Sequence, residues 1–507
     1  MLELIAVDLG AESGRVILGS FDGGCLRVEE VHRFANRPVL VGGTLYWDVL
    51  ALFAEILNGM RRARQTRKTV IQSIGVDSWG VDFALLDKSG ALLANPIHYR
   101  DKRTEGMIAY VLEHISADDL YSATGIQIMP INTIFQLAAV ARHQEHILSI
   151  AEHFAMIPDL LHFWLSGVLT CEYTNATTTQ CLDISQRTWL LSLLEHLGIP
   201  SRLFRPVIEP GTIIGSLQTE VSEATGLTRV RVIVPATHDT ASAVLATPLE
   251  DPDAAYISSG TWSLVGVEST HPLITPESRQ INLTNEGGVE NTYRILKNVM
   301  GLWLLQECRR TWARHGQSWE YHELVNAAAM ETTTGLIDPD DPSFLSPGDM
   351  VLRIIRFLAA TGQPVRETPG AITRVILQSL ALKYRWVIEK IEDLLGTTIS
   401  SIHIVGGGVH NTVLNQMVAD ATGRRVIVGP AEATAIGNLL VQLQALGEVG
   451  DRWQAREIVR RSFPLQEYQP ADNGSWDETY QRFLDLLASR ESVITRADDT
   501  EGKTNEL

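Results

Sequence analysis

The stretch Val234-Pro235-Ala236-Thr237-His238-Asp239-Thr240-Ala241-Ser242-Ala243 lies near the middle of the 507-residue chain. A β-branched run over residues 230–234 leads into it and predicts a buried strand that ends at Pro235. A helix of small residues is predicted to follow from Ala241. A carboxylate between a strand end and a helix start lies where open α/β sheets bind their ligands. Asp239 is therefore a candidate general base, and capping of the helix is the alternative.

The composition is that of an ordinary folded protein with an acidic excess. The chain has 45% hydrophobic and 20% charged residues, and 42 basic against 60 acidic side chains give a net charge of −18. This charge argues against nucleic acid or an anionic membrane as the main partner. It is compatible with a phosphorylated ligand, because backbone N–H groups bind phosphate without net positive charge. The length predicts about two to four domains.

The cysteines and the N-terminus indicate the cellular compartment. Scattered cysteines argue against a structural zinc site or a disulfide framework and fit a reducing, cytoplasmic location. They are Cys25, Cys171, Cys181 and Cys308. The N-terminus enters an apolar strand at once, without the basic and apolar regions of a signal peptide. No apolar run is long enough to span a bilayer.

The first half of the chain predicts strands joined by glycine turns, then a helix and another strand. A strand from Leu4 runs into the turn of residues 8–15, and two return strands follow as far as Phe34. Apolar residues recur at helical spacing over residues 47–62. The next predicted strand covers residues 70–77. The order is therefore three strands, a helix and a strand.

The same order recurs in the second half. Residues 254–267 again read as strand, small-residue turn and strand. A long amphipathic helix is predicted over residues 371–395, and the following strand, 401–405, ends in Gly406-Gly407-Gly408. The recurrence predicts a duplicated α/β unit, with two lobes and a cleft between them.

The predicted duplication sets the domain boundaries. We expect an N-terminal lobe in residues 1–245 and a C-terminal lobe in residues 246–470. Residues 471–507 are expected to form a C-terminal helix and a disordered tail, because the segment after about Arg490 is polar and charged.

The two glycine turns suit the phosphates of a nucleotide, because small residues let backbone N–H groups approach phosphate oxygens. Asp8 in the first turn implies Mg²⁺ held through water, since a carboxylate otherwise repels phosphate. Arg15 has two interpretations, a phosphate contact or a pair with a nearby carboxylate. The glycines 406–408 leave space for a flat adenine or its ribose. With Asp239, these features suit phosphoryl transfer.

Longer signatures carry a resemblance to a known family. In the first half they are Val7-Asp8-Leu9-Gly10-Ala11 with Ser13-Gly14-Arg15, residues 73–82, Tyr99-Arg100-Asp101, residues 172–180 and residues 237–243. In the second half they are Ser258-Ser259-Gly260-Thr261-Trp262-Ser263, residues 285–288, residues 297–306 and residues 404–408. They resemble the motifs of the FGGY carbohydrate kinases, in the actin-like ATPase superfamily, over about residues 4–465. Within that family the similarity is greatest to kinases of L-rhamnulose.

The resemblance implies two ribonuclease-H-like (actin-like ATPase) domains. It implies ATP-dependent phosphorylation of L-rhamnulose at O1, giving L-rhamnulose 1-phosphate and ADP in L-rhamnose catabolism. Asp239 matches the family's catalytic base, which takes the proton of the sugar hydroxyl as its oxygen attacks the γ-phosphorus. The implied cofactors are ATP and Mg²⁺, and the implied partners are a ketose and ATP. The expected state is a monomer or homodimer in the cytoplasm.

Further positions match binding residues of the family. The implied sugar contacts are Gly80, His238, Asp239, Thr240 and Asn298. The implied nucleotide contacts are Ala11, Glu12, Ser13, Gly14, Arg15, Thr261, Gln306, Gly406, Gly407 and Gly408, and Asp8 is the implied metal position. Glu12 departs from the family pattern, where a small residue is expected. We expect its side chain to point to solvent, with the backbone still holding phosphate.

Several residues near these motifs have structural alternatives. Trp79 either stacks on a sugar or packs in the core, and Asp82 either binds a sugar hydroxyl or lies in a turn before a strand. Asp77 either joins the Mg²⁺ shell or caps a strand at the cleft. Capping of the helix that follows the candidate base is a further role open to Thr237 or Thr240.

Two other functions stay open at this point. One is a related FGGY kinase for another ketose, L-fuculose or a pentulose, because a few pocket side chains separate these substrates. The other is a non-catalytic actin-like protein, a sugar sensor or a filament subunit. The presence of Asp239 favours an enzyme.

Overall fold

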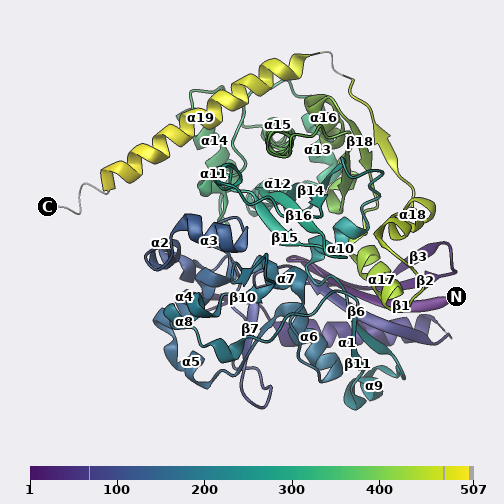
Figure 1. Cartoon of the computed structure of the whole chain (residues 1–507). Helices are drawn as coiled ribbons and strands as arrows, with labels where there is room; N and C mark the ends of the chain where they lie inside the picture. The colour runs from purple at the N-terminus through teal and green to yellow at the C-terminus, as the bar shows by residue number, and fades with distance from the viewer. Residues whose placement is uncertain (68, 472–473, 502–507) are drawn as a thin grey trace. The chain divides into compact units, whose positions relative to one another are not determined.

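The computed structural model describes residues 1–67, 69–471 and 474–501. Contacts within the chain define two units that interleave along the sequence (Figure 1). Unit 1 comprises Met1–Pro252, Val267–Lys297 and Glu432–Pro464, and unit 2 comprises Asp253–Gly266, Asn298–Ala431 and Leu465–Leu507. The chain therefore passes between the units several times, and the boundaries expected at residues 245 and 470 stay predictions.

Unit 1 is built on a six-stranded sheet with the order β11-β12-β6-β1-β2-β3. The strands are β1 (Leu2–Leu9), β2 (Ser13–Phe21), β3 (Leu26–Ala35), β6 (Ile71–Ser78), β11 (Thr212–Ser216) and β12 (Arg231–Val234). β1, β6 and β12 run parallel, whereas β2, β3 and β11 pair antiparallel with their neighbours. The continuous apolar run of β1 fits this central position, since such a strand is buried on both faces.

Helices cover both faces of this sheet (Figure 1). Val16 of β2 lies against Gly59 of α1 (Val49–Thr66). Gly19 of the same strand lies against Leu439 of α17 (Ala433–Ala445). Because residues 16 and 19 point to opposite faces of a strand, α1 and α17 lie on opposite sides of the sheet. α1 follows the helical spacing predicted for residues 47–62, and Asp48 caps its start.

Unit 1 also contains shorter elements. Its other helices are α2 (Met107–Leu112), α3 (Ala117–Thr124), α4 (Thr133–His143), α5 (Glu145–Ile150), α6 (Ile157–Ser166), α7 (Tyr173–Thr178), α8 (Leu191–His196), α9 (Thr219–Thr225), α10 (Asp239–Leu245), α11 (Pro276–Gln280) and α18 (Arg452–Ser462), with the 3₁₀ turns η1 (Lys102–Thr104) and η2 (Ser201–Leu203). Its other strands are β4 (Val39–Val41), β5 (Thr44–Tyr46), β7 (Phe83–Leu86), β8 (His153–Met156), β9 (Leu182–Asp183), β10 (Thr188–Trp189) and β15 (Thr284–Gly287).

The second sheet has the order β15-β16-β14-β13-β17-β18-β19. Its strands other than β15 are β13 (Ala255–Ser259), β14 (Trp262–Ser269), β16 (Tyr293–Met300), β17 (Ser401–Val405), β18 (Arg425–Val428) and β19 (Gln466–Tyr468). β13, β17 and β18 run parallel, and β19 pairs antiparallel with β18. β14 and β16 each contribute residues to both units.

The two sheets repeat one arrangement, so the predicted duplication is confirmed. The order β3-β2-β1-β6-β12-β11 corresponds to β16-β14-β13-β17-β18-β19, with three parallel strands at the centre of each series. The edge strands differ in connectivity. β11 precedes β12 in the chain, whereas β19 follows β18. The two sheets therefore share the spatial order of their strands. At one edge, however, the corresponding strands occur in a different order along the chain.

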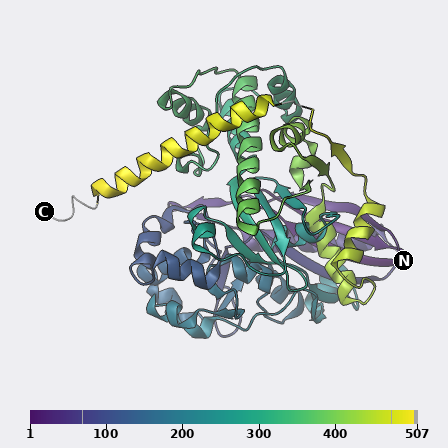
Figure 2. The ribbon, with the colours of Figure 1, turned by 45° about the horizontal axis from the view of Figure 1, so that its top comes forward.

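Unit 2 is organised around α15 (Pro369–Leu395), which Figure 2 shows along its length. It is the long helix predicted for residues 371–395, and Thr368 caps its start. α15 contacts α13 and α16 on its flanks and α19 near the start of that last helix. The remaining helices are α12 (Trp303–Arg314), α13 (Tyr321–Ala329), α14 (Met350–Ala360), α16 (Thr412–Thr422) and α19 (Ser475–Glu501), with the 3₁₀ turns η3 (Pro342–Phe344) and η4 (Gly407–His410).

The C-terminal helix extends further than the sequence indicated. We expected disorder from about Arg490, but α19 continues to Glu501. Residues 475–501 contain neither proline nor glycine, so nothing in the sequence ends the helix. The part of the predicted tail in residues 502–507 lies outside the described residues. No helix within the described ranges is both long enough and apolar enough to cross a bilayer.

Candidate functional site

The loop of residues 235–238 joins β12 to α10, and Asp239 is the first residue of that helix. His238 occupies the N-cap position, and no side chain caps the helix. The alternative in which Asp239 itself caps α10 is therefore wrong, and so is side-chain capping by Thr237 or Thr240. Cap geometry depends on the backbone angles at the helix start, which composition alone does not fix.

The carboxylate of Asp239 is held by one of its oxygens. Oδ1 accepts hydrogen bonds from Thr240 N at 2.7 Å and from Thr240 Oγ1 at 3.2 Å. Oδ2 accepts none from the residues that the structure describes. Burial raises the pKa of Asp239, and the charge of Asp8 raises it further, while His238 acts in the opposite direction. A partly exposed carboxylate with one free oxygen and a raised pKa is suited to accept a proton.

His238 links Asp239 to a buried ion pair that the sequence analysis missed. Its Nε2 lies 3.3 Å from Asp239 Oδ1, and its Nδ1 lies 3.2 Å from Glu286 Oε2 and 3.1 Å from a terminal nitrogen of Arg294. Arg294, which is fully buried, pairs with Glu286 at 3.0 Å. Burial alone would raise the pKa of Glu286, but Arg294 and His238 hold it below its usual value. Arg294 is a charged residue within the largely apolar strand β16, and this was the sequence signal from which a buried ion pair could have been predicted.

Asp8 and Asp77 place two further carboxylates near Asp239. They are directly opposite each other at the ends of the parallel strands β1 and β6. Burial raises the pKa of both, and for Asp77 the charges of Asp8 and Asp239 add to the shift. Asn438 donates to Asp77 Oδ2 at 2.6 Å, whereas the buried Oδ1 has no hydrogen-bond partner among the described residues. Like charges gathered in this way favour a bound cation.

The guanidinium of Arg15 supplies a positive charge next to Asp8. The guanidinium contacts Asp8 at 2.5 Å and also pairs with Glu432, the residue before α17. Of its two interpretations, pairing with a local carboxylate is present in the structure. Glu12 is exposed, as expected. Gly14 has a packing role, because a Cβ at that position would lie 2.3 Å from the Phe34 ring.

Gly80 lies in a constrained turn after β6. A Cβ at Gly80 would lie 2.9 Å from Thr178 Oγ1. The next residue, Val81, has a positive φ of 66°, which is strained for a β-branched residue. Two hydrogen bonds fix this conformation. The N–H of Val81 donates to Thr178 Oγ1 at 3.0 Å, and its carbonyl accepts from Thr133 Oγ1 at 2.6 Å. Strain held in this way often marks a functional loop.

Trp79 and Asp82 belong to the core. Asp82 is fully buried and accepts hydrogen bonds from the indoles of Trp47 at 2.6 Å and Trp79 at 3.0 Å. It also accepts from Tyr99 N and from Gln136. Burial raises the pKa of Asp82 to about 6, against the effect of these donors. The packing interpretation of Trp79 is therefore confirmed, and the Asp82 carboxylate points into the core.

Ala11 and Ser13 lie in unit 1, at the turn between β1 and β2, and the remaining predicted residues lie in unit 2. The carbonyl of Thr261 accepts from Gly301 N and Trp303 N, both at 3.2 Å, which joins it to the start of α12. Gln306 lies one turn into that helix, and its buried Oε1 has no hydrogen-bond partner in the part of the chain that the structure describes. Asn298 lies on β16, two residues before its end. An unpaired buried amide oxygen is a position where a ligand donor fits.

The three glycines after β17 are not equivalent. A Cβ at Gly406 would lie 2.9 Å from Ser259 O, and one at Gly408 would lie 2.0 Å from Ser259 Oγ. A Cβ at Gly407 would meet no described atom within 4 Å. Packing against β13 thus explains two of the glycines, whereas the space beside Gly407 is open among the described residues.

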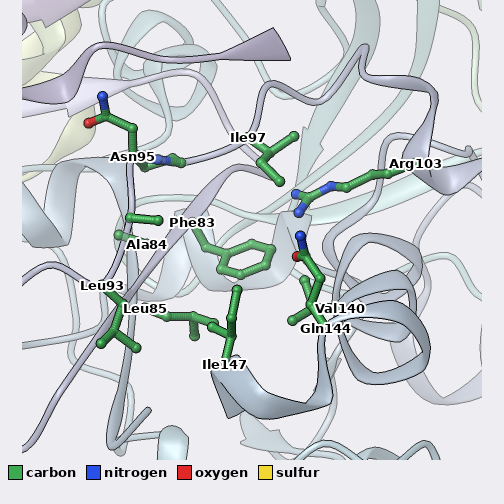
Figure 3. A pocket seen from close by; sticks show the side chains of 12 residues that line it. Phe83, Ala84, Leu85, Leu93, Asn95, Ile97, Arg103, Val140, Gln144 and Ile147 are labelled. Atoms are coloured by element: carbon green, nitrogen blue, oxygen red, sulfur yellow. The ribbon is translucent and has the colours of Figure 1, made fainter. Parts of the chain in front are cut away.

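A hollow of about 400 Å³, part of it open to solvent, lies elsewhere in unit 1 (Figure 3). Phe83, Leu85 and Ile147 line it together with the Arg103 guanidinium. None of the predicted site residues lines this hollow. Nor does the described part of the chain contain a group of three His, Cys, Asp or Glu side chains arranged to hold a metal ion. All four cysteines are free thiols.

Models of the two FGGY domains match most of the chain. The N-terminal domain of the FGGY family of carbohydrate kinases matches residues 4–246, and the C-terminal domain matches residues 255–446. The chain belongs to the FGGY family of carbohydrate kinases. As an FGGY chain it is a carbohydrate kinase, and its two α/β domains have the actin-like ATPase fold that the sequence predicted.

Relatives within the FGGY family cover nearly the whole chain. A rhamnulokinase from Bacteroides thetaiotaomicron is 45% identical over 483 residues, which are 95% of this chain and 99% of the relative. A rhamnulokinase from Oceanobacillus iheyensis is 42% identical over 464 residues, 92% of this chain and 97% of the relative.

Solved FGGY structures share the fold. A gluconate kinase from Lactobacillus acidophilus has a TM-score of 0.80 at 17% identity, covering 97% of this chain and 98% of that one. A xylulose kinase from Rhodospirillum rubrum has a TM-score of 0.79 at 19% identity, covering 97% and 99%.

Proposed function

We propose that this carbohydrate kinase phosphorylates L-rhamnulose at O1 with ATP, giving L-rhamnulose 1-phosphate and ADP. The observation that carries the substrate is the 45% identity to a rhamnulokinase over nearly the full length of both chains. Structural neighbours at 17–19% identity support only the fold. We also propose that the enzyme acts in the cytoplasm, as expected from its scattered free cysteines.

Asp239 is the general base of the proposed reaction. Its free Oδ2 takes the proton of the sugar O1 hydroxyl as that oxygen attacks the γ-phosphorus. The bond from the γ-phosphorus to the bridging oxygen breaks, and ADP leaves. His238 and Thr240, which contact Asp239, and Gly80, at the end of the neighbouring strand, bind the sugar together with Asn298. This division of roles suits phosphoryl transfer, where positioning and charge stabilisation dominate.

The nucleotide contacts are proposed in both units. The hairpin of residues 11–15 binds phosphate through its backbone. Thr261, Gln306 and the open position at Gly407, with its neighbours Gly406 and Gly408, bind the remainder of ATP. The unpaired Oε1 of Gln306 and the open space at Gly407 support this proposal.

The residues near Asp8 fit a magnesium ion. Mg²⁺ binds through one or two carboxylates, water and substrate phosphates, so a dedicated protein cage is not required. Asp8 would hold the ion through water, and the unpaired Oδ1 of Asp77 lies on the neighbouring strand end. When bound, the ion supplies neutralisation of phosphate charge. Arg15, already paired with Asp8, supplies positive charge from the protein itself.

ADP release measured with Mg-ATP and a panel of ketoses tests the substrate. We expect the highest kcat/KM with L-rhamnulose, ahead of L-fuculose and D-xylulose. Equal rates on these ketoses would contradict the substrate while leaving the kinase class intact.

The base is tested separately by D239N. We expect this variant to bind ATP and sugar but to lose about 10²- to 10⁴-fold in kcat. Turnover near that of the unaltered enzyme would contradict the role of Asp239.

A further inference from the structure

We propose that Glu172 is a positioning residue that fixes the loop of residues 237–239 and so aims the carboxylate of Asp239. The inference rests on the proposed role of Asp239 as the base. Glu172 itself lies at the start of α7, which is a different segment of unit 1 from the loop.

One set of contacts fixes Glu172 to its own helix. Its side chain is fully buried and accepts from Thr174 N at 2.8 Å, Thr174 Oγ1 at 2.7 Å and Asn175 N at 3.2 Å. These bonds satisfy N–H groups of the first turn of α7, as an N-cap does. Glu172 thereby has a fixed position before it reaches any other segment.

A second set of contacts joins Glu172 to the loop. Its Oε2 accepts from Thr237 N at 3.1 Å and from Thr237 Oγ1 at 2.5 Å. The hydroxyl of Thr174, itself bonded to Glu172, accepts from His238 N at 3.2 Å. Two successive backbone N–H groups and one hydroxyl of the loop are therefore bonded to residues 172–174.

The carbonyl of Thr237 is also bonded. It accepts from Ser78 N at 2.9 Å, at the end of β6, and from Asn175 Nδ2 at 3.4 Å. The N–H and the carbonyl of Thr237 are thus both hydrogen-bonded to neighbouring segments, the start of α7 and the end of β6. The residue two positions later is Asp239, so rotation of the Thr237 backbone would move the carboxylate.

Helix capping alone does not account for this carboxylate. The common N-cap residues are Ser, Thr, Asp and Asn, and Asp48 and Ser116 serve α1 and α3 with one hydrogen bond each to a backbone N–H of the helix. Glu172 has a longer side chain and accepts from five donors, two of them on the loop. The side chain is fully buried, and burial raises its pKa despite these donors. A buried acid with donors on two segments fixes their relative position.

The matched pair T237V and T237S tests the contact. T237V removes the hydroxyl bond to Glu172 and keeps the shape of the side chain, whereas T237S restores the hydroxyl. We expect T237V to lower kcat by about 10- to 100-fold, as for a small displacement of a catalytic group. The KM values for ATP and ketose should stay within about threefold, and T237S should recover most of kcat.

A double-mutant cycle distinguishes positioning from a general structural effect. We expect E172Q to lower kcat at least as much as T237V, and E172Q/T237V to be no worse than E172Q alone, because both act through one contact. The control is E307Q in unit 2, which alters a buried carboxylate that accepts from Gly348 N at 3.1 Å. Its kcat should be unchanged even if its melting temperature falls.

The outcomes separate this inference from the proposed base. Unchanged kcat in T237V, or effects of E172Q and T237V that multiply, would overturn the positioning role while D239N stayed inactive. An active D239N would instead overturn the base. If E172Q does not fold, the pair T237V and T237S still decides the question, because equal losses in both variants would contradict the hydroxyl contact.

Discussion

At the residue scale, the raised pKa of Asp239 has a kinetic consequence. A base acts in its ionised form, so activity is lost as the pH falls through its pKa. Because burial raises that pKa above its usual value of 3.8, the acid limb of kcat/KM should lie above pH 3.8. Steady-state rates over a pH series measure it, and return to neutral pH after each incubation controls for unfolding. A limb below pH 3.8 would contradict the assignment.

Asp82 predicts a pH dependence of stability. Its folded pKa of about 6, against a usual 3.8, means that the folded state binds a proton more tightly than the unfolded state. A raised acid pKa makes the folded state less stable above the folded value, and this penalty disappears as the pH falls below 3.8. The difference between a pKa of about 6 and one of 3.8 corresponds to about 3 kcal/mol in the free energy of unfolding.

The comparison with D82N isolates that contribution. The free energy of unfolding of the unaltered protein minus that of D82N should increase by about 3 kcal/mol between pH 7 and pH 3.5, as measured by urea denaturation. The control D393N alters an exposed carboxylate, whose side chain is 71% exposed. A difference between the unaltered protein and D82N that does not change with pH would contradict the raised pKa.

At the element scale, the close approach of α10 and α17 explains the small residues that the sequence shows in both. Gly437 of α17 faces the backbone of α10, where a Cβ would lie 1.8 Å from Ser242 O. The sequence predicted the helix of small residues after Asp239, but it did not indicate that this helix touches α17. Because α10 carries Asp239 at its first residue, this contact also sets the position of the candidate base.

The variant G437A tests this contact. Alanine has the higher helix propensity, but the added Cβ must displace backbone, so we expect the free energy of unfolding to fall by about 1–3 kcal/mol. The control G24A places its Cβ no closer than 3.8 Å to a neighbouring atom. Urea denaturation compares the two. Equal stability of G437A and G24A would show that the helices separate at little cost.

At the scale of the whole molecule, four proposed contacts can be assigned to one unit each. Gly80 and the base lie in unit 1, whereas Thr261 and Gln306 lie in unit 2. The duplicated sheets explain the pattern, because each brings a strand end and a glycine turn to one edge. Substitutions of Gly80 and of Gln306 should therefore affect different substrates.

Two variants test that separation. Q306A removes an unpaired amide oxygen and should raise the KM for ATP by about 10-fold, in line with the loss of one hydrogen bond, while the KM for the ketose stays unchanged. G80A adds a Cβ 2.9 Å from Thr178 Oγ1 and should raise the KM for the ketose but not for ATP. Initial-rate kinetics with each substrate varied in turn give both constants. Parallel changes in both KM values would contradict separate roles.

Local sequence patterns predicted the first strands, the helices near residues 47–62 and 371–395, the duplication and the family. Local signals carry this information, since strands, glycine turns and helix spacing repeat in both halves, and long signatures mark the FGGY kinases. Sequence motifs also indicated Asp8, Arg15 and Asp239 as candidate site residues, and their roles stay predictions. The same motifs also indicated the exposure of Glu12.

The tertiary structure decided which groups meet. It brought Glu172 into contact with the loop before Asp239 and paired Glu286 with Arg294 beside His238. The contacts of Glu172 and His238 join residues far apart in the chain, and no local pattern encodes them. It also assigned Trp79 and Asp82 to the core and permuted the edge strand of one sheet. The physical reason is that hydrogen bonding and desolvation depend on neighbours in space, whereas propensity and periodicity depend on neighbours in sequence.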